Sequence, residues 1–262
     1  LNDHFGDDIV FIPQGSHHNR TNVKHDSDVD MAVMYKPTFF ADVSRLSATD
    51  KELHELYRIP GTYEYAQFKS DVYDLLRREF GSSDVERRDK CIRVEGNSSR
   101  VSADVVPAFE HRRFSAYDVV AARGIRIVTD KGRHIHSFPL QHYDNGVAKN
   151  DRTGKAYKSA VRVLKNTRND LKDKELLRAE DMASFLIECL VWNVPEGFFV
   201  GKTYREDALA VTAKIWNDMR DPSTANRYME VCDLRSLFGD NPHHTRERAE
   251  DFALQAWQHI NN

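Results

Sequence analysis

The sequence predicts an α+β protein, with strands gathered in the first half of its 262 residues and helices in the second. In the first half, short apolar runs alternate with clusters of Gly, Pro, Ser and Asn, which is typical of strands and turns. In the second half, apolar residues recur at steps of three and four, the spacing of amphipathic helices. We therefore expect a sheet lobe over residues 1–150 and a helical lobe over residues 151–262.

Composition and charge restrict the class of protein. Apolar residues make up 40% of the chain, enough for a sizeable core, and a net charge of −3 is not typical of proteins that coat duplex nucleic acid. The three cysteines, Cys91, Cys189 and Cys232, form no Cys-x-x-Cys pair, so neither a disulfide framework nor a zinc ribbon is indicated. Neither a membrane-spanning apolar run nor a signal peptide is visible. We expect a cytoplasmic protein without a membrane partner.

The first candidate site lies between two apolar runs near the N-terminus. One run leads into a turn that reads Gln14-Gly15-Ser16, and the other starts directly after Asp28 and Asp30. Residues i and i+2 of a strand point to the same face, so Asp28 and Asp30 should stand side by side. Paired carboxylates suit Mg²⁺, which fills its other positions with water and substrate phosphate. An isolated Asp-x-Asp usually marks a solvated turn, but this combination favours a metal and phosphate site.

The next stretch predicts the end of one strand, then a helix and a further strand. Pro37 should end the pairing of the second strand, because proline cannot donate a hydrogen bond to a ladder. Residues 63–80 have helical spacing and are followed by Gly81 as a C-cap. Residues 90–94 read as a strand.

Asp104 is the next informative residue. It shares the polar face of an alternating run with Ser102, opposite Val101, Ala103 and Val105. A lone buried carboxylate is costly, so Asp104 either lies in water on an edge strand or joins the upstream pair as a third metal carboxylate. We favour the third carboxylate because of the upstream pair.

These acid motifs resemble the nucleotidyltransferase superfamily of DNA polymerase β, whose signature is Gly-Ser, a spacer and Asp-x-Asp between two strands. The resemblance implies that the backbone and hydroxyl of Gly15 and Ser16 hold nucleotide phosphates. It also implies a third acid on a later strand of the same sheet, a position that Asp104 fits.

The remaining chain predicts a hairpin, a polar loop and a series of helices. Residues 124–128 and 133–137 read as the hairpin, and residues 139–154 as the loop. The helices are expected at about 155–172, 180–193, 205–219, 223–237 and 245–260.

The first of these helices carries a basic stripe. Its members recur at steps of three or four and are Lys155, Lys158, Arg162, Lys165, Arg168 and Lys172. Like charges at this spacing destabilise a helix, so the stripe either faces solvent, the commoner case for an isolated helix, or serves an anion. The resemblance implies that a nucleoside triphosphate is this anion, and lysine acts on phosphate as a point charge. Lys165 is the first choice for the triphosphate contact and Lys158 the second.

The following helix restricts the resemblance to one family within this superfamily. It contains Ser184-Phe185-Leu186-x-Glu188, about twenty residues after Lys165. A serine there can simply bond back to a backbone carbonyl. Together with the acid motifs, however, the pattern over residues 9–195 is similar to the cGAS/DncV-like nucleotidyltransferases (CD-NTases).

The family resemblance implies a fold and a set of roles. The expected fold is a polymerase β-like sheet lobe packed against a C-terminal helical lobe, with the active site in the cleft between them. Lys165 and Ser184 would bind the triphosphate tail, and Phe185 would stack on a base. Phe185 replaces a residue that is often Tyr, which excludes a polar contact from its ring.

The resemblance also implies a two-metal nucleotidyl transfer. Asp28 and Asp30 would bridge two Mg²⁺ ions, for which Mn²⁺ can substitute, and Asp104 would hold the ion that activates a ribose hydroxyl. ATP and other nucleoside triphosphates would be joined into a cyclic di- or oligonucleotide second messenger in bacterial antiphage defence. Alternatives are a transferase that adds nucleotides to RNA or another acceptor, and a non-catalytic nucleotide sensor of the same fold.

The partners and the product follow less closely from the sequence. The family's vertebrate zinc insertion has no counterpart in this chain, so no DNA activator is expected. A regulatory protein partner, the nucleotide pair, the 2′–5′ or 3′–5′ linkage and the ring size stay open.

Overall fold

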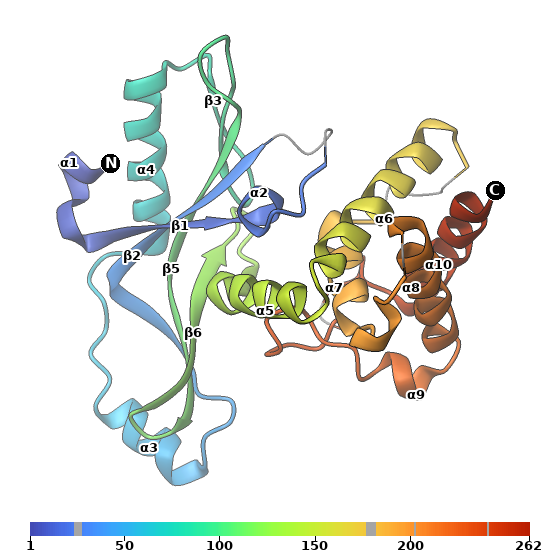
Figure 1. Ribbon diagram of the computed structural model, residues 1–262. Coiled ribbons are helices and arrows are strands. Elements are labelled where there is room, and N and C mark those ends of the chain that lie inside the picture. Colours follow the sequence, from blue (N-terminus) through green and yellow to red (C-terminus); the bar gives the residue numbers. More distant parts are fainter. Residues whose placement is uncertain (24–27, 177–181, 202, 240) are drawn as a thin grey trace. The chain divides into compact units, whose positions relative to one another are not determined.

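The computed structural model describes residues 1–23, 28–176, 182–201, 203–239 and 241–262 (Figure 1). The chain divides into two compact units. The sheet unit comprises residues 1–17 and 27–139, and the helical unit comprises residues 18–26 and 140–262. The mixed α+β architecture predicted from the sequence is confirmed, whereas the lobe boundary near residue 150 stays a prediction.

One mixed β-sheet forms the centre of the sheet unit. Within the described residues its strands are β1 (Ile9–Gln14), β2 (Val29–Asp42), β3 (Val85–Arg87), β4 (Ile92–Val94), β5 (Ala103–Ala116), β6 (Val119–Val128) and β7 (His134–Ser137). They follow the order β1-β2-β5-β4-β3, and β6 pairs with both β5 and β7. Only the β2–β5 pair is parallel among these pairings. The central strand β5 therefore has β2 on one side and β4 followed by β6 on the other.

The predicted end of the second strand at Pro37 is wrong. β2 continues to Asp42, and its register with β5 shifts between Tyr35 and Phe39. The three residues between them, Pro37 among them, form a bulge outside the ladder. The missing N–H of Pro37 therefore removes no ladder bond.

The helices of the sheet unit are short except for one. They are α1 (Asn2–Phe5), the 3-10 turn Gly6–Asp8, α3 (Ala48–Leu56), α4 (Tyr65–Phe80) and the first part of α2 (Gly15–Asn19), which continues into the helical unit after residue 17. The predicted helix is confirmed as α4, and it ends at Gly81, whose φ is +90°. α4 runs beside the sheet (Figure 1) and packs Phe68 and Val72 into the core with Ile92 of β4 and Phe109 of β5. The sheet unit therefore has its own apolar core.

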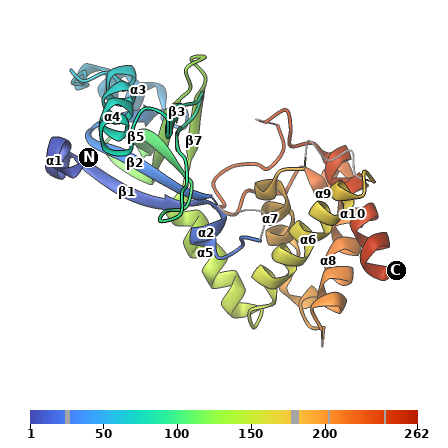
Figure 2. The ribbon, with the colours of Figure 1, turned by 90° about the horizontal axis from the view of Figure 1, so that it is seen from above.

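The helical unit contains the longer helices of the second half. They are α5 (Pro139–Arg152), α6 (Ala156–Asp173), α7 (Ser184–Asn193), the 3-10 turn Glu196–Phe198, α8 (Tyr204–Met219), α9 (Pro222–Ala225) and α10 (Arg246–Asn261). α6, α7, α8 and α10 pack together (Figure 2) around buried side chains that include Tyr157, Leu164, Leu186, Val211 and Phe252. No helix in the described part of the chain is long and apolar enough to span a membrane.

Two expectations for the second half are wrong. The expected loop at 139–154 is the helix α5, and the expected helix at 223–237 is only the short α9. The helix expected from residue 180 begins at Ser184, and residues 180–181 lie outside the described residues. The hairpin is confirmed as β6 and β7.

Candidate active site

Polar side chains from four strands form one row across the sheet. The register pairs Asp30 of β2 with Asp104 of β5, and Asp104 with Arg93 of β4. On the other side, Gln14 of β1 pairs with Asp30. Paired residues on neighbouring strands lie on the same face of a sheet, and Asp28 shares that face because it is two residues before Asp30. The register thus brings Asp104, from a distant part of the sequence, beside the adjacent pair Asp28 and Asp30.

The row carries more negative than positive charge. Burial, followed by the nearby carboxylates of Asp104 and Asp28, raises the pKa of Asp30 to about 6, and His17 and Arg93 offset this only in part. A carboxyl group whose negative form is disfavoured in this way indicates a site short of cations.

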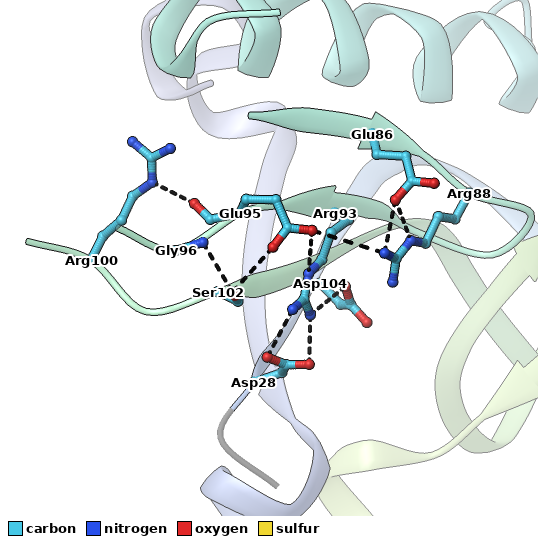
Figure 3. A network of polar contacts seen from close by, with 9 residues as sticks. All are labelled: Asp28, Glu86, Arg88, Arg93, Glu95, Gly96, Arg100, Ser102 and Asp104. Atoms are coloured by element: carbon cyan, nitrogen blue, oxygen red, sulfur yellow. Dashed lines mark hydrogen bonds and ion pairs between the residues drawn. The ribbon is translucent and has the colours of Figure 1, made fainter. Parts of the chain in front are cut away.

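Arg93 is the cation that the row contains (Figure 3). Its Nη1 lies 2.6 Å from Asp28 Oδ2 and 3.3 Å from Asp104 Oδ1, and its Nε lies 3.3 Å from Glu95 Oε1. The hydrogen bond to Asp28, outweighing burial, raises the pKa of Arg93 above its ordinary value. The same guanidinium nitrogen therefore joins the first and third of the predicted metal carboxylates.

Gly15 is in direct contact with Asp30. Its φ is +74°, and a Cβ at this position would lie only 1.9 Å from Asp30 Oδ2. Both the left-handed backbone and the close approach require glycine. The Gly-Ser motif therefore lies against one of the candidate metal carboxylates, with Ser16 half-buried in α2.

The donor atoms fit a hard divalent cation. The three aspartates offer only oxygen, and their surplus negative charge matches the preference of Mg²⁺ for carboxylates. Among the described residues, however, no three His, Cys, Asp or Glu side chains are arranged to hold a metal ion. The guanidinium of Arg93 is placed between Asp28 and Asp104, so a metal ion would have to compete with it.

The predicted lysines of the helical unit are buried on α6. Lys165 is 1% exposed, and its Nζ donates a hydrogen bond to the carbonyl oxygen of Thr21 at 3.0 Å. Lys158 is 6% exposed, its Nζ lies 5.6 Å from the ring centre of Tyr143, and burial lowers its pKa. Neither is the solvent-facing lysine of an ordinary basic stripe.

Ser184 and Phe185 begin α7. Ser184 Oγ accepts a hydrogen bond from Arg168 Nη1 at 3.0 Å, which joins the start of α7 to α6. Phe185 is 36% exposed, and its ring centre lies 5.8 Å from that of His244 and 5.7 Å from that of His142. The structure therefore places Ser184 close to the basic face of α6 and leaves part of Phe185 accessible.

Two residues with central positions are not predicted from the sequence. Arg93 has a weak signal, because it alternates with the apolar Ile92 and Val94 on a predicted strand. Its contact with Asp28 depends on strand register, and no local sequence pattern predicts it. Glu188 belongs to the motif that carries the family resemblance, but its own contacts depend on the packing of three helices.

A sheet that gathers Gly-Ser and three aspartates, in a chain with a helical second half, defines the polymerase β-type nucleotidyltransferase class. Comparison with known proteins gives the family. Residues 144–261 match the model of the cGAS/DncV-like nucleotidyltransferase C-terminal helical domain. The chain belongs to the CD-NTase family and is a nucleotidyltransferase, as predicted.

Similar proteins span almost the whole chain. A cyclic dipurine nucleotide synthase of Elizabethkingia meningoseptica is 39% identical over 256 residues, which cover 98% of this chain and 86% of that protein. A cyclic dipyrimidine nucleotide synthase, CdnE of Legionella pneumophila, is 37% identical, with 97% and 84% covered. The solved structure of Elizabethkingia meningoseptica CdnE with GTP and Apcpp matches 100% of this chain and 88% of its own, with a TM-score of 0.83 and 36% identity. These matches confirm the predicted fold class.

Proposed function

We propose that this chain joins nucleoside triphosphates into a cyclic di- or oligonucleotide and releases pyrophosphate. The observation that carries the proposal is the register that places Asp30 and Asp104 side by side, with Asp28 on the same face. The similarity to cyclic dipurine and cyclic dipyrimidine nucleotide synthases supports it. In each transfer, a ribose hydroxyl oxygen forms a bond to an α-phosphorus, the bond to the β-phosphate breaks, and pyrophosphate leaves.

The three aspartates would hold the metal ions. We assign Asp28 and Asp30 to both of two Mg²⁺ ions, which Mn²⁺ can replace, and Asp104 to the ion at the attacking hydroxyl. When bound, such ions lower the pKa of the hydroxyl and neutralise charge on the pyrophosphate. Asp104 would also assist in taking up the hydroxyl proton. Catalysis then consists mainly of positioning and charge stabilisation.

The nucleotide-binding residues would come from both units. From the sheet unit, we assign Gln14, Gly15 and Ser16 to the phosphates, because the close approach of Gly15 to Asp30 brings this backbone to the carboxylates. From the helical unit, we assign Lys158, Lys165 and Ser184 to the triphosphate and Phe185 to base stacking. The exposed fraction of Phe185 supports its role. Lys165→Ala is expected to weaken nucleotide binding, and unchanged affinity would point to Lys158.

The choice of bases does not follow from overall similarity. The relative that makes cyclic dipurine products is 39% identical, and the one that makes cyclic dipyrimidine products is 37% identical. Identities this close favour neither pair of bases. The cytoplasmic location, the role in antiphage defence and independence of a DNA activator stay predictions.

A product assay tests the proposal. The protein is incubated with all four nucleoside triphosphates and Mg²⁺ or Mn²⁺, without nucleic acid, and phosphatase-treated products are analysed by chromatography and mass spectrometry. A phosphatase-resistant cyclic product is expected. Product only after RNA is added would favour the RNA-end transferase, and metal-dependent nucleotide binding without turnover would favour the sensor.

A further inference from the structure

The segment that follows the Gly-Ser motif is held by three helices of the helical unit. We call residues 18–23 the post-motif segment. Its contacts to helical residues join His18 to Tyr143 of α5, Arg20 to Arg162 of α6, and Thr21 to Lys165 of α6 and Glu188 of α7. Asn19, Thr21 and Val23 are buried as well. The segment is therefore packed like part of a core, although it contains no strand and only the end of α2.

Glu188 is at the centre of these contacts. Thr21 Oγ1 donates a hydrogen bond to Glu188 Oε2 at 2.9 Å, and His142 Nε2 lies 3.0 Å from Glu188 Oε1. Lys165 Nζ lies 3.9 Å from Glu188 Oε2 and donates to the carbonyl oxygen of Thr21. One carboxylate thus joins the post-motif segment to α5 and α6.

The charged form of the Glu188 carboxylate depends on each of its hydrogen-bond and charge partners. Burial acts to raise the pKa of Glu188, but bonding to His142, the charge of Lys165 and the hydrogen bond from Thr21 together hold it below its ordinary value. A buried carboxylate that loses a hydrogen-bond donor keeps its desolvation cost without compensation. Removal of the Thr21 hydroxyl should therefore loosen the segment rather than leave it unchanged.

We propose that Thr21 and Glu188 are positioning residues for the nucleotidyl transfer, and that their hydrogen bond anchors the backbone that leaves Gly15 and Ser16. The inference rests on the proposed function. The anchored segment starts two residues after Ser16 and shares α2 with it, so movement of Thr21 is transmitted through a short stretch of chain. A displacement of about 1 Å in a positioning group can cost on the order of a hundredfold in rate.

The experiment compares four variants, three at threonines and Glu188→Gln. Thr21→Val removes the hydroxyl at nearly constant shape, and Thr21→Ser keeps it. Thr212→Val is the matched control, because Thr212 is equally buried and its hydroxyl, within the described residues, donates to the carbonyls of Ala208 and Leu209 in its own helix α8. Hydrogen exchange of the post-motif segment is measured without metal or nucleotide, and kcat and KM are measured in the product assay.

In Thr21→Val, the amide hydrogens of residues 18–23 are expected to exchange with solvent at least tenfold faster than in Thr212→Val. The kcat of Thr21→Val should fall about tenfold or more with a smaller change in KM, because positioning rather than nucleotide contact is lost. Thr21→Ser should restore both. Glu188→Gln, which keeps an acceptor for Thr21 but loses the charge beside Lys165, should lie between Thr21→Val and wild type.

Equal exchange in Thr21→Val and Thr212→Val, or an unchanged kcat in Thr21→Val, would overturn the positioning role. Failure of Thr21→Ser to restore exchange would assign the effect to packing and would also overturn it. If the wild-type protein formed no product from any nucleotide, the proposed function would fail, whereas the exchange measurement would still decide whether the anchor exists.

Discussion

Arg93 binds Asp28 through both of its terminal guanidinium nitrogens, at 2.6 Å and 3.0 Å. The two residues are 65 positions apart in the sequence and meet because β4 and β2 flank the start of β5. The guanidinium neutralises part of the carboxylate row and is also the group with which a bound metal ion would compete. We therefore expect the affinity for metal to depend on an arginine that is not itself assigned as a ligand.

Arg93→Met is expected to bind Mn²⁺ about tenfold more tightly than wild type. A charge-assisted hydrogen bond contributes about 1.5 kcal/mol or more, and wild type must break one of this kind before metal binds. Without metal, the variant should melt at a lower temperature, because the carboxylates lose their counter-ion. Titration calorimetry and thermal unfolding with EDTA or Mn²⁺ measure both effects.

Arg88→Met is the matched control for Arg93. Arg88 precedes β4 and pairs with Glu86 at 2.8 Å, and within the described residues it forms no ion pair with the three aspartates. Its Mn²⁺ affinity should stay at the wild-type level. Equal affinity in Arg93→Met and wild type would show that the guanidinium does not compete with metal.

Asp104→Asn is expected to reduce product formation by more than about a hundredfold while the fold stays intact. Residues that only support a metal ligand already contribute about ten- to a hundredfold, and Asp104 is assigned as a ligand itself. Incorporation of labelled nucleotide measures the loss, and circular dichroism measures the fold. Asp118→Asn, at the turn between β5 and β6, is the control, because its φ of +58° suits asparagine. Full activity in Asp104→Asn would remove Asp104 from the site.

Gly15→Ala is expected to abolish activity because the new Cβ collides with Asp30 Oδ2. Gly132→Ala separates this collision from the backbone cost, since Gly132 has a φ of +77° but a Cβ there would meet no atom of the described residues within 4 Å. Both variants should lose about 1 kcal/mol of unfolding free energy from the left-handed backbone, and only Gly15→Ala should lose product formation. Denaturant unfolding and the product assay measure the two effects. Wild-type activity in Gly15→Ala would contradict the assigned position of this motif.

His111 is expected to make the sheet unit sensitive to acid. Burial, followed by the charges of His136 and Arg126, lowers its pKa to about 4, with Asp42 opposing and Arg113 adding to the effect. His111 therefore binds a proton near pH 6.5 in the unfolded chain but only near pH 4 in the folded protein. This contribution to stability is therefore complete above pH 6.5 and is lost as the pH falls toward 4.

Through His111, the free energy of unfolding can fall by about 3 kcal/mol, at about 1.36 kcal/mol for each unit by which the pKa is lowered. Denaturant unfolding of wild type and His111→Phe between about pH 7 and pH 4.5 measures it. Phenylalanine keeps a ring against Phe138, 5.7 Å away between ring centres, but cannot titrate. The variant should lose less stability than wild type over this range, and parallel losses would contradict the assignment to His111.

Local patterns predicted the elements that depend on local physics. α4 has the helical spacing and terminal glycine that the sequence shows, and the β6–β7 hairpin has its turn residues. α5 resembles a loop in the sequence because it is rich in polar residues and contains a glycine. In the structure, Asn145 of α5 bonds to Val231 O, and Lys149 bonds to Val194 O, which ties this polar helix to distant parts of the helical unit.

Local patterns in the amino-acid sequence were enough to indicate the class of chemistry. Gly-Ser, Asp28-x-Asp30 and an alternating strand with Asp104 are local patterns, because the two-residue period of a strand decides which side chains share a face. The folded chain was needed to see that Arg93 lies among these aspartates and that Lys165 is buried against Thr21 and Glu188. Both outcomes depend on strand register and helix packing between residues far apart in the chain, and no short sequence period encodes such contacts.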